Sequence, residues 1–336
     1  MSVDSGRDYG VISFGAYDNA SGAKKAIDIK RNNNEELLKK YSTETPPEPL
    51  ILFTSLARQS IKEKFKEIGL LIPDSQIVDP IFVDERYKSK LAKQLDDTYE
   101  EETAGVYGVV NKRPIIFLGE DRFCYNNYNY ANNIYHEMFH STGANFAVID
   151  KDTIKDGRIG LAVLGPESLY KTVLLEEGLA VHESGYFCDQ IVQILPKQYK
   201  KEFEMKQKRV SENKNHGKIE FISDETGHIL RINPKYTFLS FETDSNNAIL
   251  VINPIYALAG EFVDTMLNSV PKTEKDEFLK TIFLARDNPK QISKLASTID
   301  NYFGKGMYVK ILKCEITEKS ILALTKELES KKSSKP

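Results

Sequence analysis

The sequence has few of the features that mark disulfide-rich, membrane-spanning or nucleic-acid-binding proteins. Its three cysteines, Cys124, Cys188 and Cys314, are odd in number, widely spaced and form no CxxC pair, which excludes a disulfide framework and a thiolate zinc site. We expect each to be a small buried thiol. No run approaches the roughly 18 apolar residues of a membrane span. The net charge of −3 indicates no general affinity for nucleic acid or membrane surfaces.

The first residues, 1–10, are polar and lack the apolar core of a secretory signal. The expected location is therefore cytoplasmic by default, with export by a specialised route left open. At 336 residues the chain is long enough to bury a sizeable core, in one large or two modest domains.

The most specific chemical signal is a HExxH pentapeptide, His136-Glu137-Met138-Phe139-His140. Two histidines four residues apart lie about 40° from each other around an α-helix, so both imidazoles can hold one Zn²⁺. The intervening Glu137 points to the open side of such a metal, where it can take a proton from water. The pentapeptide therefore predicts a zinc hydrolase with His136 and His140 as ligands and Glu137 as general base.

The flanking residues favour this interpretation over a helix without a metal. The stretch 129–139 has apolar residues at helical spacing, and Gly143 follows as a helix stop. Upstream, the β-branched and aromatic run 113–118 predicts a strand. Strand, short connection and HExxH helix is the order that a zincin requires.

A catalytic zinc site needs a third protein ligand and one open position. The segment 174–182, LLEEGLAVH, offers Glu177, whose helical neighbours are apolar, so that its carboxylate would be buried and would need a cation or metal as partner. Glu176 lies about 100° away around the helix and is the weaker candidate. The alternative for both is a solvated acidic pair.

Two further features of this segment affect the site. Gly178 and Ala180 have small side chains or none, so the helix can approach the HExxH helix closely. His182 does not share the face of Glu177. It is either a group behind the ligands, a group on the substrate side, or an ordinary histidine at a polar edge.

HEMFH followed by Glu-Glu-Gly-Leu-Ala resembles the gluzincin metallopeptidases, the clan that includes thermolysin and the aminopeptidase N relatives. In many of them the third ligand is the glutamate of an Asn-Glu-Gly-Leu/Phe-Ala segment, which corresponds to Glu177. Glu176 stands where those proteins have asparagine. The resemblance covers roughly residues 75–285 and implies one zinc ion per chain and a peptide or protein substrate.

The clan also tends to carry a later tyrosine at the head of a helix, which hydrogen-bonds the oxyanion. The segment 256–263, YALAGEFV, is similar to the Tyr-x-x-Ala-Gly-x-Phe-Val pattern of several subfamilies. The resemblance therefore implies that Tyr256 is the oxyanion donor. The alternative is an aromatic residue packed into the core, in which case His182 and His228 are the next candidates for the donor.

The chain departs from the aminopeptidase branch at one place. Those enzymes carry a Gly-Ala-Met-Glu-Asn segment whose glutamate grips the amino terminus of the substrate. The comparable segment here, 103–108, reads TAGVYG and contains no acidic residue, and residues 100–102 are a solvated run of glutamates. Endopeptidase or narrow-specificity cleavage is therefore favoured over exopeptidase action.

The pattern of elements predicts an α+β, zincin-like fold, with a small mixed β-sheet lobe over a helical lobe and the metal site in the groove between them. Residues 1–49 form an entry segment, with a strand at 11–14 and a helix at 34–40, followed by a linker at 42–49. Residues 50–195 form the catalytic core, with helices at 56–68 and 89–97, strands at 77–83, 106–110 and 114–118, and the Glu177 helix running to about 195. Residues 196–330 are mostly helical, with a β-hairpin near 217–232.

The predicted function is that of a zinc metallopeptidase. Two alternatives stay open: a zinc-binding scaffold without catalysis, and a protein-targeted toxin or effector on the same fold. Glu137 argues against the scaffold, because a structural zinc site has no need of a base at that position.

Overall fold

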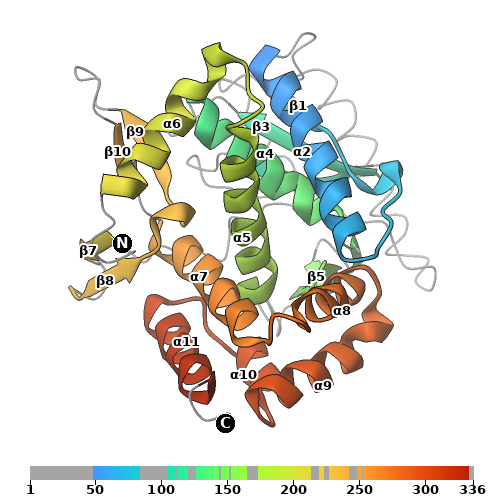
Figure 1. The fold of residues 1–336 in the computed structure, drawn as a ribbon. Coiled ribbons are helices and arrows are strands. Elements are labelled where there is room, and N and C mark those ends of the chain that lie inside the picture. The colour runs from blue at the N-terminus through green and yellow to red at the C-terminus, as the bar shows by residue number, and fades with distance from the viewer. Residues whose placement is uncertain are drawn as a thin grey trace.

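The computed structural model describes residues 48–83, 105–110, 113–119, 126–143, 145–150, 153–164, 173–212, 219–222, 227–241, 248–251 and 253–332. The strand predicted at 11–14, the helices predicted at 34–40 and 89–97, and Cys124 lie outside these residues. Figure 1 shows the described elements around a central helix, α5, with the C-terminal helices gathered at one end.

The helices are α2 (Glu48–Glu67), α4 (Asn127–Ser141), α5 (Val173–Ile191), α6 (Lys197–Glu212), α7 (Pro254–Ser269), α8 (Lys275–Asp287), α9 (Ile292–Phe303), α10 (Met307–Leu312) and α11 (Glu318–Lys332). Short 3₁₀ turns are η1 (Asp74–Gln76), η3 (Pro234–Tyr236) and η4 (Pro289–Gln291). The strands are β1 (Pro80–Val83), β2 (Gly105–Val110), β3 (Arg113–Gly119), β4 (Asn145–Asp150), β5 (Thr153–Ile159), β6 (Ala162–Leu164), β7 (Ile219–Ile222), β8 (Ile229–Ile232), β9 (Phe238–Phe241) and β10 (Ala248–Val251).

The sheet closest to the HExxH helix is small and mixed. Its strand order is β1-β3-β2, with β1 parallel and β2 antiparallel to β3. Helix α4 packs against β2 and β3. Three further antiparallel units, β4-β5-β6, β7-β8 and β9-β10, complete the described sheet structure. The chain is therefore a helix-rich α+β protein, as predicted, while its assignment to the zincin-like folds stays a prediction.

Helix α5 is buried almost all round, which is the expected position for a helix with apolar residues on every face. From Leu174 to Cys188 only Tyr186 is exposed. Gly178 permits one of its close contacts, because a Cβ there would lie 2.5 Å from the carbonyl oxygen of Ala259 in α7. The sequence predicted that Gly178 lets α5 approach the HExxH helix closely. This prediction is wrong, because the helix that approaches α5 at Gly178 is α7.

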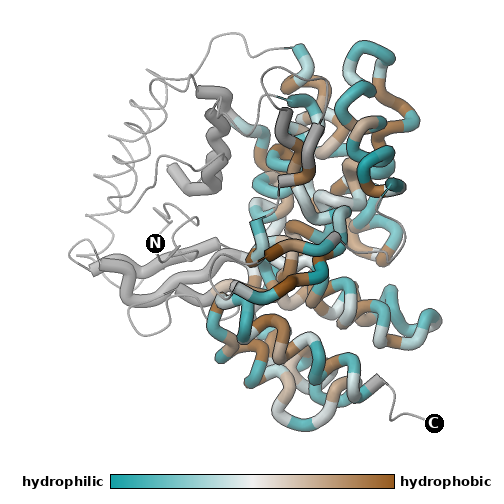
Figure 2. The backbone as a smooth tube through the Cα atoms, turned by 90° about the vertical axis from the view of Figure 1, so that its left-hand side faces the viewer, coloured by the Kyte–Doolittle hydropathy of each residue, from teal (hydrophilic) through white to brown (hydrophobic). Residues whose placement is uncertain are grey.

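One hydrophobic cluster runs from α2 through α4, α5 and α7 to the C-terminal helices α8–α11. Figure 2 shows hydrophobic and hydrophilic residues alternating along these helices, as in amphipathic helices packed around a shared core. The cluster continues on both sides of residue 195, where the sequence predicts the end of the catalytic core. None of the described helices is long and apolar enough to cross a membrane.

Several local predictions are confirmed and two are wrong. The strand pair around residues 111–113 and the hairpin near 217–232 are present, as β2-β3 and β7-β8. The predicted linker, 42–49, is wrong at its end, because α2 already begins at Glu48, where an acidic residue complements the helix N-terminus. No strand is predicted from the sequence between α4 and α5, whereas in the structure β4, β5 and β6 form a sheet there.

Lys206 of α6 is a buried cation that joins this helix to the chain entering β9. Its ammonium donates hydrogen bonds to the carbonyl oxygen and to Oγ1 of Thr237, the latter at 2.7 Å. It also lies 4.8 Å from the centroid of the Tyr128 ring. Burial lowers the pKa of Lys206 to about 7, although Cys188 and Asp189 act in the opposite direction.

Replacing Lys206 with methionine should remove a pH dependence from the free energy of unfolding. Between the folded pKa of about 7 and the ordinary lysine pKa of about 10.4, the unfolded chain binds a proton that the folded protein does not. The contribution of Lys206 to the free energy of unfolding therefore rises across this window, by on the order of several kcal/mol. Chemical denaturation at a series of pH values measures the slope.

The matched control for this prediction is Lys208→Met on the same helix, since the Lys208 side chain is 73% exposed. This variant should keep the wild-type slope. A Lys206→Met curve parallel to that of the wild type would show that Lys206 stays charged in the folded protein.

Candidate metal centre

Helix α4 holds the HExxH residues in a fixed position through both of its ends. At its start, the Asn126 side chain accepts a hydrogen bond from the backbone N–H of Asn129, 2.9 Å away, and so caps the helix. The Asn129 side chain in turn bonds both backbone groups of Leu239 in β9, at 2.7 and 2.9 Å. At its end, Thr142 Oγ1 donates to the carbonyl oxygen of Phe139. The helix therefore cannot slide or rotate without breaking buried hydrogen bonds.

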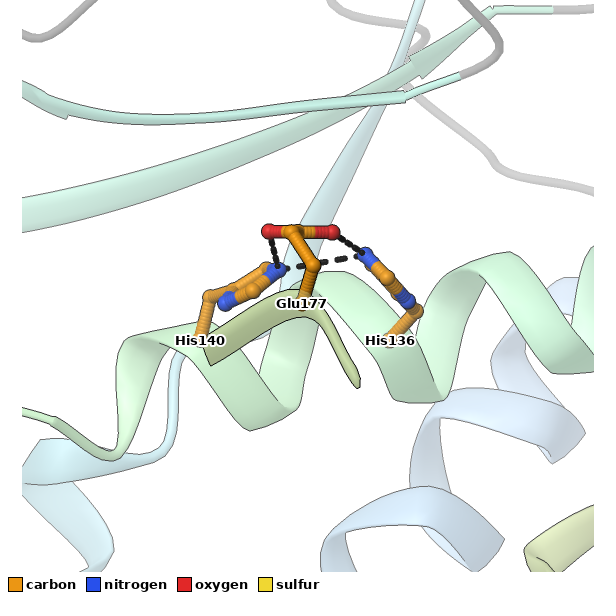
Figure 3. A group of neighbouring side chains, drawn as sticks. All are labelled: His136, His140 and Glu177. Atoms are coloured by element: carbon orange, nitrogen blue, oxygen red, sulfur yellow. Dashed lines mark hydrogen bonds and ion pairs between the residues drawn. The ribbon is translucent and has the colours of Figure 1, made fainter. Parts of the chain in front are cut away.

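The structure brings His136, His140 and Glu177 together (Figure 3). Nε2 of His136 lies 3.1 Å from Glu177 Oε2, and Nε2 of His140 lies 2.8 Å from Glu177 Oε1. The two Nε2 atoms are 3.1 Å apart. The side chains come from α4 and α5, which pack against each other. Two imidazole nitrogens and a carboxylate thus converge on one point.

These donors fit a zinc ion. Ligand bonds of about 2.0–2.1 Å in a tetrahedron place neighbouring donor atoms roughly 3.3 Å apart, and the observed separations are a few tenths of an ångström shorter. Burial and the neighbouring His140 hold the pKa of His136 well below its usual range, which favours the neutral imidazole that binds metals. If these three residues bound a zinc ion, they would leave open the fourth position that a catalytic zinc requires.

Glu176 does not face this point but lies directly behind it. Its Oε1 is 3.2 Å from Nδ1 of His140, on the opposite side of the ring from the Nε2 that faces Glu177. A carboxylate in this place fixes the proton on Nδ1 and leaves the Nε2 lone pair for a metal. Both Glu176 and Glu177 are buried, so the alternative of a solvated acidic pair is wrong.

Arg286 of α8 neutralises Glu176. Its Nη2 and Nε lie 2.6 and 3.0 Å from the two carboxylate oxygens, and the arginine is itself 1% exposed. Its other donors bond Thr142 Oγ1 and the carbonyl oxygen of Phe139, while the guanidinium lies 4.0 Å from the Phe139 ring centroid. Burial alone would raise the pKa of Glu176, but Arg286 and His140 outweigh it and hold that pKa well below its usual range.

The turn between β5 and β6 completes the surroundings of Glu176. The backbone N–H of Leu161 donates to its Oε2 over 2.9 Å. Gly160, in the left-handed region at φ +50°, lies so close that a Cβ there would meet the same oxygen at 2.3 Å. A side chain at this position would displace the carboxylate, so the glycine is required by both its backbone angle and its neighbour.

Tyr256 lies beside the predicted metal ligand His136, in the first turn of α7. Pro254 begins this helix, a position that favours proline because its missing N–H has no partner within the helix. The Tyr256 ring is half-buried, and its centroid is 6.2 Å from that of His136, at an interplanar angle of 70°. Tyr256 also packs against the hydrophobic core, so it lies beside a predicted ligand and has the contacts of a packing residue as well.

The structure places the remaining predicted residues separately. Glu137 is partly exposed on α4, between the two histidines. His182 is buried, and its Nδ1 lies 3.1 Å from the hydroxyl of Tyr236, so it is not the histidine at a polar edge. His228 is exposed, next to β8.

Sequence reasoning missed Arg286 and the β5-β6 turn. Arg286 is 110 residues from Glu176 along the chain and stands in an ordinary amphipathic helix with no motif around it. The only available signal was that two adjacent glutamates in an apolar helix need two partners. Comparisons with protein-family models, curated proteins and solved structures give no match. The gluzincin resemblance therefore rests on the motifs alone and stays a prediction.

Single substitutions should distinguish the residues that bind the metal from the residues that lie behind them. We expect His136→Ala and His140→Ala to abolish zinc binding and Glu177→Ala to weaken it strongly. Glu176→Ala should lower affinity by only about 10–100-fold, because it removes a group behind the ligand. Elemental analysis and competition with a chelator measure occupancy and affinity.

The control for the zinc measurements is His228→Ala, which should keep full occupancy because its imidazole is exposed. Full zinc content in His140→Ala would rule out a metal site formed by His136, His140 and Glu177. A larger loss in Glu176→Ala than in Glu177→Ala would move the third ligand to Glu176.

Arg286→Met should destabilise the fold by about 3–5 kcal/mol, because it leaves the buried Glu176 carboxylate without its counter-ion. Adding Glu176→Gln should recover much of this loss, since the charge is then removed as well. Denaturant unfolding measures both variants. Arg231→Met, at a side chain 71% exposed on the β7-β8 hairpin, should leave stability unchanged. A double variant no more stable than Arg286→Met would show that the arginine acts mainly through packing.

Proposed function

We propose that this chain is a zinc-dependent metallopeptidase of the gluzincin type. The observation that carries the proposal is the convergence of His136, His140 and Glu177, with His140 held from behind by Glu176. A set of three ligands with an oriented histidine and a glutamate inside the motif suits a catalytic zinc better than a structural one.

Zinc, when bound, would act as a Lewis acid and lower the pKa of a water molecule to about 7. Glu137 takes a proton from the attacking water as the oxygen adds to the carbonyl carbon of the scissile peptide bond. The protonated Glu137 then gives this proton to the leaving nitrogen as the C–N bond breaks, which yields a carboxylic acid and an amine; the acid then passes its own proton to the amine, giving a carboxylate and an ammonium. Water is the only co-reactant.

The phenolic hydroxyl of Tyr256 donates a hydrogen bond to the oxygen that becomes negative in the tetrahedral intermediate. Its position beside His136 supports this role, because a donor must reach the carbonyl of a substrate held at the ligands.

Strand β2 is the element that best suits an extended peptide. In the order β1-β3-β2 it lies at one side of the sheet, and it packs against the HExxH helix. An edge strand binds a peptide through main-chain hydrogen bonds. The absence of an acidic residue from segment 103–108 favours cleavage within a chain over removal of an amino-terminal residue.

Two alternatives use the same metal site. One is a zinc-binding scaffold without turnover, and the other is a toxin or effector that cleaves one protein. Digestion of a fluorogenic peptide library by the zinc-loaded protein tests all three. Cleavage of several peptides supports the peptidase, zinc binding without cleavage supports the scaffold, and cleavage of one partner protein alone supports the effector.

Glu137→Gln should keep the zinc and the fold but lower kcat by at least about 10²–10⁴-fold, the usual contribution of a positioned general base. The measurement uses a peptide found in the library, with zinc content determined on the same sample. Activity within a few-fold of the wild type would contradict the role of Glu137 as general base.

Tyr256→Phe should leave zinc content, stability and KM nearly unchanged and lower kcat by about 10²–10³-fold, the cost of one lost oxyanion donor. Tyr199→Phe, at a ring that packs against Phe53 in the core, is the matched loss of a hydroxyl elsewhere and should leave kcat unchanged. An unaltered kcat in Tyr256→Phe would show that Tyr256 is a packing residue and not the oxyanion donor.

A further inference from the structure

Helix α8 reaches the candidate metal centre through Arg286, which stands in the last turn of the helix. Its partner Glu176 precedes it by 110 residues, and α8 lies well beyond residue 195, where the sequence predicts the end of the catalytic core. The apolar side chains of α8 pack in the hydrophobic cluster that also contains residues of α4 and α5. The position of this late helix therefore determines where the guanidinium lies behind the ligands.

Arg286 holds the surroundings of His140 from two sides. Behind the imidazole ring it bonds both oxygens of Glu176, whose Oε1 is 3.2 Å from Nδ1 of His140. Along the backbone it donates to the carbonyl oxygen of Phe139 at 3.0 Å and to Oγ1 of Thr142 at 2.9 Å, on either side of His140 in the chain. The ring and the main chain at this predicted ligand are thus both fixed from α8.

The bond from Glu176 to His140 depends on the arginine. Glu176 and Arg286 are each 1% exposed, so their charges compensate each other out of reach of water. Without the guanidinium, Glu176 would be a buried carboxylate without its counter-ion, which is costly enough to drive the group toward water or toward another cation. Either movement takes the carboxylate away from Nδ1 of His140.

A carboxylate behind a histidine ligand contributes to metal affinity, and its loss typically costs about 10–100-fold. If α8 has to be docked for Glu176 to stay behind His140, then docking of α8 favours zinc by about this factor. Binding free energies are reciprocal, so zinc must favour the docked position of α8 by the same factor.

We propose that zinc binding at His136, His140 and Glu177 is coupled to the docking of α8, and that Arg286 is the positioning residue through which the coupling acts. This inference rests on the metal site of the proposed function, but not on peptide hydrolysis. The metal centre then includes a helix of the C-terminal region, and zinc holds that helix against the rest of the protein.

The first test is hydrogen exchange of the full chain, measured by mass spectrometry with and without zinc. We expect the amides of α8 to exchange about 10–100-fold more slowly with zinc. The amides of α11, which packs against α7 and α9, serve as the internal reference and should change much less. Equal slowing in α8 and α11 would show that zinc stabilises the whole fold, and no slowing in α8 would show that the helix is uncoupled. Either result would overturn the proposal.

The double variant Glu176→Gln/Arg286→Met shows whether the arginine carries the effect. It lacks the ion pair but also lacks the unpaired charge, so it should fold. In this protein, zinc at saturating concentration should no longer slow α8 more than α11. A persistent preference for α8 would mean that the coupling runs through the apolar contacts of the helix and not through Arg286.

The second test is zinc affinity, measured by competition with a chelator on folded protein. Arg286→Met should weaken zinc by about 10–100-fold. Glu176→Ala/Arg286→Met should be within about threefold of Glu176→Ala, because both substitutions remove the same contact with His140. Independent effects would multiply to about 10²–10⁴-fold in the double variant and would overturn the proposal.

Two further variants separate positioning from general stability. Leu328→Ala removes a fully buried side chain from α11 and so lowers stability, yet the folded protein should keep the zinc affinity of the wild type. Arg286→Lys keeps the positive charge but not the planar fork that bonds two carboxylate oxygens. It should fold even if Arg286→Met does not, and should weaken zinc less than Arg286→Met. Wild-type affinity in folded Arg286→Lys and Arg286→Met would overturn the proposal.

The two proposals fail in different ways. A wild-type chain that binds zinc and protects α8 but cleaves no peptide supports the coupling and contradicts the peptidase. A chain that cleaves peptides with zinc, but whose α8 exchanges equally fast with and without the metal, contradicts the coupling alone. A wild-type chain that binds no zinc contradicts both.

Discussion

The pairing of Glu176 with Arg286 is the interaction on which the arrangement of the candidate metal centre depends. The carboxylate is buried one residue before the predicted ligand Glu177, and its charge there is tolerable only with a counter-ion and full hydrogen bonding. Arg286 supplies the charge from α8, and the β5-β6 turn supplies a backbone donor. One carboxylate therefore joins α5, α8 and this turn to His140 of α4. Displacing any of them leaves a buried charge or donor unpaired.

This network is not explained by stability alone. Replacing a buried ion pair by apolar side chains of similar volume is often neutral or stabilising, whereas removing one partner is costly. The geometry instead points to orientation: Glu176 contacts the ring nitrogen of His140 that faces away from Glu177 and so determines which nitrogen is available to a metal. Arg286 also bonds the carbonyl oxygen of Phe139, and thus holds the end of α4 as well as the carboxylate.

The sequence predicted those features that depend on residues close together in the chain. The i, i+4 spacing of His136 and His140, the apolar surroundings of Glu177 and the helix start before Tyr256 are local patterns, and each side chain lies near the place that its pattern indicates. The role of Glu176 was not visible, because its partner Arg286 is 110 residues away in a helix without a motif. Gly178 shows the same limit: a glycine predicts a close approach, but only the fold selects α7 as the helix that approaches.

Helix α5 carries three glutamates within eight residues, and its burial on all sides forces each of them to have a partner. Glu176 is satisfied within the protein by Arg286, His140 and the Leu161 backbone. Glu177 faces one ring nitrogen of His136 and one of His140, an arrangement that suits a shared cation. Glu183 pairs through Oε2 with Lys64 of α2, and its Oε1 has no hydrogen-bond partner among the residues that the structure describes. The same physical constraint thus gives three outcomes along one helix: a fully hydrogen-bonded ion pair with Arg286, a site that suits a metal, and an ion pair that joins α5 to Lys64 of α2.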